Sequence, residues 1–186
     1  MRFTACSLPG LIVVEPSVFE DSRGFFFEAF NSRAFRENGI GCAFVQDNQS
    51  RSTAGVIRGL HFQVNPHAQA KLVRVLEGAI RDVTVDLRKG SPTYGQHFAI
   101  ELSADNKKQL MIPDGFAHGF SVLSETAVVL YKCDQYYHRE SERGIRFDDP
   151  SLGIDWGIDA SSAVVSEKDA ALPLFRDCET NFNFAT

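Results

Sequence analysis

The chain has 186 residues, 44% of them hydrophobic, which is enough for the core of one globular domain over residues 1–186. Its formal net charge is −5 at pH 7, so it has no general basic field and we expect no nucleic-acid partner. The cysteines Cys6, Cys42, Cys133 and Cys178 form no CxxC pair. This spacing disfavours a zinc site, gives no disulfide pattern, and favours free thiols in a reducing compartment.

The first apolar stretch is interrupted by Pro9-Gly10 and followed by Glu15. It is too short for a signal peptide or a membrane span. We therefore expect a soluble, cytoplasmic protein with no membrane partner.

Most of the chain has the alternating, β-branched or aromatic character of strands. Turns rich in glycine and proline, such as Lys89-Gly90-Ser91-Pro92, separate these segments. Many short strands at regular spacing favour a β-sandwich or barrel. In chain order the predicted strands are 11–14, 25–30, 58–63, 71–78, 79–87, 97–102, 109–112, 118–123 and 126–132.

Helical patterns are sparse. Residues 32–39 predict one short helix, with Ser32 as its N-cap and Gly39 at its end. Residues 166–171 predict another helical turn. The alternation is lost after Tyr137, so we expect the C-terminal third to wrap the barrel as loops and short helices.

One strand-like segment carries cations. Arg58-Gly59-Leu60-His61-Phe62-Gln63 is followed, eight residues after Gln63, by Lys71. Buried cations are costly unless an anionic group meets them. These residues therefore predict a cavity for an anionic substrate if they face the core.

The stretch Pro113-Asp114-Gly115-Phe116-Ala117-His118 resembles the second sequence motif of cupins. That resemblance implies an all-β, double-stranded β-helix jelly roll with a few short peripheral helices. In metal-binding cupins the histidine of this motif joins an HxH pair and a glutamate. Here the corresponding place is His61-Phe62-Gln63, so the ligand set is incomplete and no metal is expected.

Between about Phe19 and Pro173 the chain carries an ordered set of motifs. The fragments are 21–28 (DSRGFFFE), 46–50 (QDNQS), 56–63 (VIRGLHFQ), 71–75 (KLVRV), 86–95 (DLRKGSPTYG), 113–120 (PDGFAHGF), Tyr131 with Tyr136, and 166–169 (SEKD). Each fragment alone is weak, whereas the ordered set is highly specific. The set resembles the dTDP-4-dehydrorhamnose 3,5-epimerase family.

The resemblance implies proton chemistry without a metal, nicotinamide or flavin. His61 would be the general base, and Asp169 would orient its imidazole. Lys71 would stabilise an enolate oxygen, and Tyr131 would donate a proton to the opposite face of the carbanion. No GxGxxG loop opens a helix, which agrees with cofactor-free chemistry.

The resemblance also implies a nucleotide-diphosphate sugar as ligand and a homodimer with shared sites. Arg23, Arg58 and His118 would meet phosphate oxygens. The other implied binding residues are Phe26, Glu28, Gln46, Asp47, Asn48, Tyr136, Glu142 and Lys168. Because the family exchanges an early strand between subunits, Phe26 and Glu28 would serve the partner's site.

The expected reaction is inversion of C3 and C5 in dTDP-4-dehydro-6-deoxy-D-glucose, which yields dTDP-4-dehydro-L-rhamnose. Several alternatives stay open at this point. They are an epimerase acting at C3 only or C5 only on a related nucleotide sugar, a ketoisomerase of the same 4-keto sugar, a metal-dependent oxygenase, and a non-catalytic sugar-binding cupin.

Overall fold

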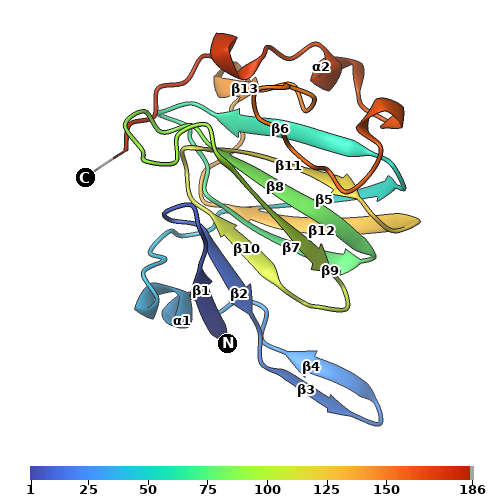
Figure 1. Ribbon diagram of the computed structural model, residues 1–186. Coiled ribbons are helices and arrows are strands. Elements are labelled where there is room, and N and C mark those ends of the chain that lie inside the picture. Colours follow the sequence, from blue (N-terminus) through green and yellow to red (C-terminus); the bar gives the residue numbers. More distant parts are fainter. Residues whose placement is uncertain (185–186) are drawn as a thin grey trace.

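The computed structural model describes residues 1–184; the last two residues of the predicted domain 1–186 lie outside this part. Two antiparallel sheets face each other and form a jelly roll, which confirms the predicted all-β fold (Figure 1). The six-stranded sheet has the order β1 (Arg2–Ala5), β2 (Ile12–Glu15), β10 (Gln109–Ile112), β7 (Lys71–Glu77), β12 (Thr126–Cys133) and β5 (Gln46–Thr53).

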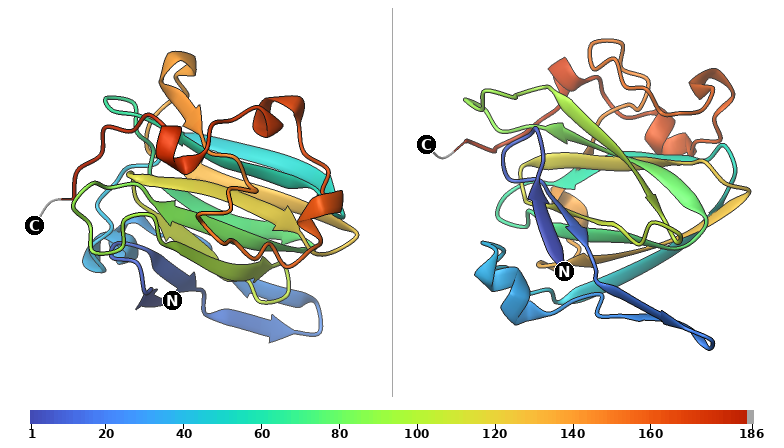
Figure 2. Two further views of the ribbon diagram at one scale, coloured as in Figure 1. Left: turned by 45° about the horizontal axis from the view of Figure 1, so that its top comes forward. Right: turned by 60° about the horizontal axis from the view of Figure 1, so that its bottom comes forward.

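The five-stranded sheet combines segments from distant parts of the sequence. Its order is β13 (Glu142–Gly144), β6 (Ile57–Gln63), β11 (Phe116–Val122), β8 (Ala79–Asp86) and β9 (His97–Ser103). A separate hairpin of β3 (Val18–Asp21) and β4 (Gly24–Phe27) projects from the body of the molecule (Figure 2).

Apolar side chains fill three layers. Leu110, Val129 and Phe120 belong to the cluster between the two sheets. Trp156 belongs to a second cluster, in which the C-terminal segment covers the outer face of the five-stranded sheet (Figure 2). Phe35 of the first helix belongs to a third cluster, on the outer face of the six-stranded sheet. The C-terminal covering confirms the predicted wrapping.

The helices are short and peripheral, as predicted. They are α1 (Ser32–Glu37), η1 (Arg139–Ser141), η2 (Ala160–Ser162), α2 (Glu167–Ala170) and η3 (Phe175–Asp177). The predicted N-cap of the first helix is wrong by one residue. The side chain of Asn31 accepts hydrogen bonds from the backbone N–H groups of Arg33 and Ala34, so Ser32 is already helical.

The strand predictions differ from the structure mainly at the N-terminal half. The segment 25–30 was too long, because β4 ends at Phe27. Strands β1, β3, β5 and β13 were not predicted. The sequence of β5 is entirely polar (QDNQSRST), so it lacks the apolar alternation that identifies a strand. Among residues 1–184, no helix has the length and apolar character needed to cross a membrane.

Candidate active site

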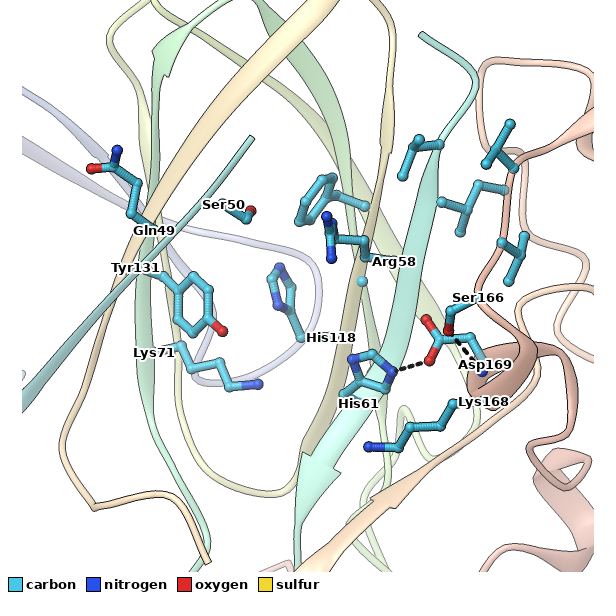
Figure 3. Close-up of a pocket in the computed structure, with 16 residues that line it drawn as sticks. Gln49, Ser50, Arg58, His61, Lys71, His118, Tyr131, Ser166, Lys168 and Asp169 are labelled. Carbon is cyan, nitrogen blue, oxygen red and sulfur yellow. Dashed lines mark hydrogen bonds and ion pairs between the residues drawn. The ribbon is translucent and has the colours of Figure 1, made fainter. Parts of the chain in front are cut away.

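A row of polar side chains crosses the inner face of the five-stranded sheet. In the strand register His61 of β6 lies opposite His118 of β11, which in turn lies opposite Thr84 of β8. Residues directly opposite each other in antiparallel strands present their side chains to the same face. The two histidines therefore face the space between the sheets, as Figure 3 shows.

Two glycines allow β6 and β11 to approach closely beside these histidines. Gly59 has a φ of +123°, and a Cβ added there would lie 2.5 Å from the Cα of Gly119. A Cβ added to Gly119 would lie 2.7 Å from the carbonyl oxygen of Arg58. Any larger side chain at these positions would force the strands apart and move His61.

The six-stranded sheet supplies the opposite wall. Tyr131 of β12 pairs with Asn48 of β5 on one side and with Val73 of β7 on the other. Lys71 pairs with Cys133, two residues along the same face from Tyr131. The Lys71 ammonium lies 6.0 Å from the centroid of the Tyr131 ring. Both polar ends point into a cavity of about 450 Å³, across from the histidines (Figure 3).

His61 has a carboxylate partner from a distant part of the chain. Its Nε2 lies 2.8 Å from Oδ1 of Asp169, while Oδ2 accepts the backbone N–H of Gly59 at 3.2 Å. Burial opposes ionisation of Asp169, but the hydrogen bonds from His61 and Gly59 outweigh it, so the pKa of this carboxyl is lowered. With Nε2 held by a carboxylate, the other ring nitrogen, Nδ1, points toward the cavity (Figure 3).

His118 forms a second histidine–carboxylate pair. Its Nε2 lies 2.8 Å from Oδ2 of Asp82, whose side chain is fully buried. Oδ1 of Asp82 and Oγ1 of Thr84 have no hydrogen-bond partner among the described residues. Asp82 was not among the residues predicted from the sequence. The period-2 alternation of residues 79–87 places it on the same face as Ile80 and Thr84, so a buried acid could have been inferred there.

The cavity shifts the titration of the two residues on the opposite wall. Burial lowers the pKa of the Lys71 ammonium, although Cys133, Asp82 and Glu142 act in the opposite direction. Burial is also the main reason that the pKa of the Tyr131 phenol is raised. A phenol with a raised pKa keeps its proton at neutral pH, as a proton donor must.

A second lobe of about 300 Å³ adjoins this cavity and shares His61, Lys71 and Tyr131 with it. Glu142 of β13 lies at its rim, where it accepts a hydrogen bond from the Tyr137 hydroxyl at 2.9 Å and pairs with the Lys168 ammonium at 2.7 Å. Burial opposes ionisation of Glu142, but these two contacts outweigh it and lower its pKa.

The comparisons with known proteins agree on one family. The family described as dTDP-4-dehydrorhamnose 3,5-epimerase matches residues 5–177. The dTDP-4-dehydrorhamnose 3,5-epimerase of Pseudomonas aeruginosa is 52% identical over 180 residues, covering 96% of this chain and 98% of the relative. The chain belongs to the dTDP-4-dehydrorhamnose 3,5-epimerase family. Like its relatives, it is an isomerase.

Solved structures of the family confirm the cupin jelly roll. The Legionella pneumophila dTDP-6-deoxy-D-glucose-3,5-epimerase, in complex with dTDP-4-keto-L-rhamnose, matches with a TM-score of 0.91 and 48% identity over 95% of this chain and 93% of that chain. A more distant structure, of the 3′-monoepimerase ChmJ from Streptomyces bikiniensis in complex with dTDP-quinovose, matches with a TM-score of 0.85. It is 32% identical, over 91% of this chain and 85% of that chain.

The structure brings most residues implied by the epimerase resemblance together around the two lobes. They come from β5, β6, β7, β11, β12, β13 and α2, and are Gln46, Asn48, Arg58, His61, Lys71, His118, Tyr131, Glu142, Lys168 and Asp169. Further residues line the lobes although the resemblance gave them no role in the site, and these are Gln49 and Ser50 of β5, Gln63 of β6 and Tyr137.

Five residues implied by the resemblance do not line the cavity of their own chain. Arg23 pairs with Asp21 at the tip of the projecting hairpin, and Asp47 pairs with Lys132 at 3.0 Å on the outer face of β5. Glu28 accepts a hydrogen bond from Asn31. The remaining two, Phe26 and Tyr136, are exposed. Within residues 1–184 no group of three or more His, Cys, Asp or Glu side chains is placed to hold a metal ion.

Proposed function

We propose that this protein inverts C3 and C5 of dTDP-4-dehydro-6-deoxy-D-glucose, giving dTDP-4-dehydro-L-rhamnose. The observation that carries the proposal is the opposition of the His61–Asp169 pair to Lys71 and Tyr131 across one cavity. Inversion needs a base on one face of the sugar ring and an acid on the other. The Legionella pneumophila relative in complex with dTDP-4-keto-L-rhamnose supports this choice of substrate.

In the proposed reaction the C4 ketone acidifies the hydrogens on C3 and C5. His61 removes one of them as a proton, and the electron pair of the broken C–H bond moves onto the C4 oxygen to form an enolate. The ammonium of Lys71 stabilises that oxygen. At C5, Tyr131 then protonates the carbon from the opposite face, which inverts that centre, and the Tyr131 phenolate and the His61 imidazolium exchange protons with solvent.

The cationic part of the cavity suits the diphosphate. The guanidinium of Arg58 is held at its Nε by the Ser52 hydroxyl, 2.9 Å away, so its terminal nitrogens can meet phosphate oxygens. His118 lies on the neighbouring strand, oriented by Asp82. Lys168, Glu142, Gln46 and Asn48 border the remainder of the ligand in this proposal.

A homodimer is part of the proposal. Arg23, Phe26 and Glu28 lie on or beside the projecting β3–β4 hairpin and away from the cavity of their own chain. A second copy of the chain would receive this hairpin and with it these three residues.

A cytoplasmic location is also proposed, in keeping with four cysteines that are unpaired within the described residues.

The test measures solvent deuterium entering C3 and C5 of the sugar. His61→Ala should abolish incorporation at both carbons, because the base is missing. Tyr131→Phe should keep some exchange while inversion at C5 falls sharply. Undiminished exchange in His61→Ala would exclude His61 as the base, and equal loss at both carbons in Tyr131→Phe would contradict the assigned acid.

The same experiment separates the alternatives. An epimerase acting at C3 only would label one carbon, and similarity to the 3′-monoepimerase ChmJ, at 32% identity, favours this as the second candidate. A sugar-binding cupin without activity would bind the ligand and label neither carbon. A ketoisomerase would give a product with its carbonyl at another position.

A further inference from the structure

The loop from Tyr136 to His138 is held between the ends of both sheets. The backbone N–H of Tyr137 donates to Oε1 of Gln46, on β5 of the six-stranded sheet, at 3.0 Å. The next N–H, of His138, donates to Oε1 of Gln63, on β6 of the five-stranded sheet, at 2.7 Å. Two consecutive amides are thus fixed by glutamines from opposite walls of the barrel.

The Gln63 amide is fully engaged with the backbone. Besides accepting from His138, its Nε2 donates to the carbonyl oxygen of His67 at 2.7 Å and to that of Tyr136 at 3.4 Å. The residue is 4% exposed. A buried amide whose two donors and acceptor are all used by backbone groups has a structural task and little capacity left for a ligand.

Further contacts around Gln63 join two loops, the one between β6 and β7 and the one that follows β12. The backbone N–H of Ala70 donates to Oδ1 of Asp134 at 2.7 Å, and the Gln69 side chain donates to the carbonyl oxygen of Gln135 at 2.8 Å. The rings of His67 and His138 stack with their centroids 3.9 Å apart. Gln63 lies at the centre of this unit, because it alone of these side chains bonds to both loops and belongs to a core strand.

The loop in turn places Tyr137 in the wall of the second lobe. The Tyr137 hydroxyl donates to Glu142, which pairs with Lys168, and the lobe is shared with His61. Gln63 also borders this lobe, but its amide group is bonded to the backbone of the two loops. The geometry points to Gln63 as a positioning residue, which sets substrate affinity by holding Tyr137 against Glu142. This inference rests on the proposed function and adds a residue to it.

The main variant is Gln63→Met, which keeps the length of the side chain and removes its hydrogen bonds. We expect KM for the dTDP-linked 4-keto sugar to rise about tenfold while kcat changes by less than about threefold. The reason is that the loop contributes to binding, whereas His61, Lys71 and Tyr131 lie on strands that the change leaves in place. An unchanged KM would overturn the inference.

A second variant, Gln63→Glu, adds a pH readout. When protonated, the new carboxyl group donates to the His67 carbonyl and accepts from the His138 N–H; when ionised, it faces two carbonyl oxygens. Burial raises the pKa of such a group. The ratio of its KM to that of the unaltered enzyme should therefore fall as the pH is lowered from about 8 to about 6. A ratio independent of pH would overturn the inference.

Asn106 provides a matched control, because its side-chain amide also ties three backbone groups, those of Glu101, Ser103 and Lys108, in the β9–β10 turn. Asn106→Leu should leave KM unchanged. If it raises KM as much as Gln63→Met does, the effect is one of general stability and the positioning role is wrong.

Hydrogen–deuterium exchange separates failure of this inference from failure of the proposed function. Amides of residues 134–138 should exchange faster in Gln63→Met than in the unaltered protein, whether or not the sugar is turned over. Unaltered exchange there would refute the positioning role. Faster exchange in Gln63→Met, together with no epimerised product from the unaltered protein, would refute the proposed function and would leave the role of Gln63 in holding the loop unaffected.

Discussion

At the scale of single residues, the site contains two histidine–carboxylate pairs with the same 2.8 Å separation and different surroundings. The His61 side chain is 33% exposed and borders the cavity, whereas the His118 side chain is 8% exposed. A general base must reach both substrate and solvent, so exposure favours His61 for proton transfer. The buried pair suits a fixed hydrogen bond to the ligand.

Asp169→Asn should lower kcat by a factor of about 10² to 10⁴, with a much smaller change in KM. The amide keeps the shape of the side chain but cannot stabilise the imidazolium that forms when His61 takes a proton. Steady-state kinetics on the 4-keto sugar would measure this. Asp148→Asn, which changes an exposed carboxylate paired with Arg146, should have no effect. A loss below tenfold in Asp169→Asn would contradict the orienting role.

The sequence predicted the residues that meet in the cavity better than the residues that support them. His61, Lys71, Tyr131 and Asp169 came from ordered motifs, although 108 residues separate His61 from Asp169 and no local pattern links them. The supporting contacts of Gln63 go to backbone groups of loops, and loop conformation leaves no periodic trace in the sequence. Such contacts can be identified only from the folded structure.

At the scale of elements, strands with apolar alternation were predicted and polar ones were not. Strand β5 was missed because all its residues are polar, and its inward-facing residues Asn48 and Ser50 line the cavity. The hairpin strand β4 was predicted to be too long because aromatic residues continue in the sequence as far as Phe30. In the structure Phe30 lies outside any sheet and packs on Phe35 of α1. Tertiary surroundings overrode local propensity in both cases.

The connection between β8 and β9 depends on one buried carboxylate. Asp86 accepts hydrogen bonds from Arg88, Ser91 and Thr93. Burial alone would raise its pKa, but these bonds outweigh it and lower the pKa from 3.8 to about 2. Because the folded-state pKa is lowered, the stabilisation is present above pH 4 and is lost as the pH falls toward about 2.

Asp86→Asn should therefore reduce the free energy of unfolding by about 2 kcal/mol at pH 7. The difference from the unaltered protein should persist at about pH 5 and fall to roughly half near pH 3. Urea unfolding at these pH values would measure it, with Asp105→Asn, an exposed carboxylate, as control. A difference independent of pH would show that the charge of Asp86 does not stabilise the loop.

At the scale of the whole molecule, the projecting hairpin is unusually apolar for an exposed element. Phe19 of β3 lies directly opposite Phe26 of β4, and the two are 66% and 70% exposed. Phe25 and Phe27 occupy the other face, near Lys107 and Arg74. Exposed apolar clusters of this kind mark sites of association. If a second copy of the chain binds this hairpin, the contact would cover its apolar surface and would also bring Arg23 and Glu28 to the cavity of that second copy.

Replacing Phe26 by serine tests this assembly. The substitution removes the phenyl ring and with it most of the apolar surface that the Phe19–Phe26 pair would bury in a partner. The dissociation constant of the dimer should therefore rise at least about tenfold. Light scattering on the unaltered protein should give twice the chain mass of 20.7 kDa, and on Phe26→Ser a mass that falls toward 20.7 kDa on dilution. Tyr94→Ser, which removes another exposed aromatic in the β8–β9 connection, should leave the mass unchanged.

The activity of Phe26→Ser should fall as its mass falls, because each cavity would lose the hairpin supplied by its partner. A Phe26→Ser variant that is monomeric and fully active would show that the site is complete in one chain.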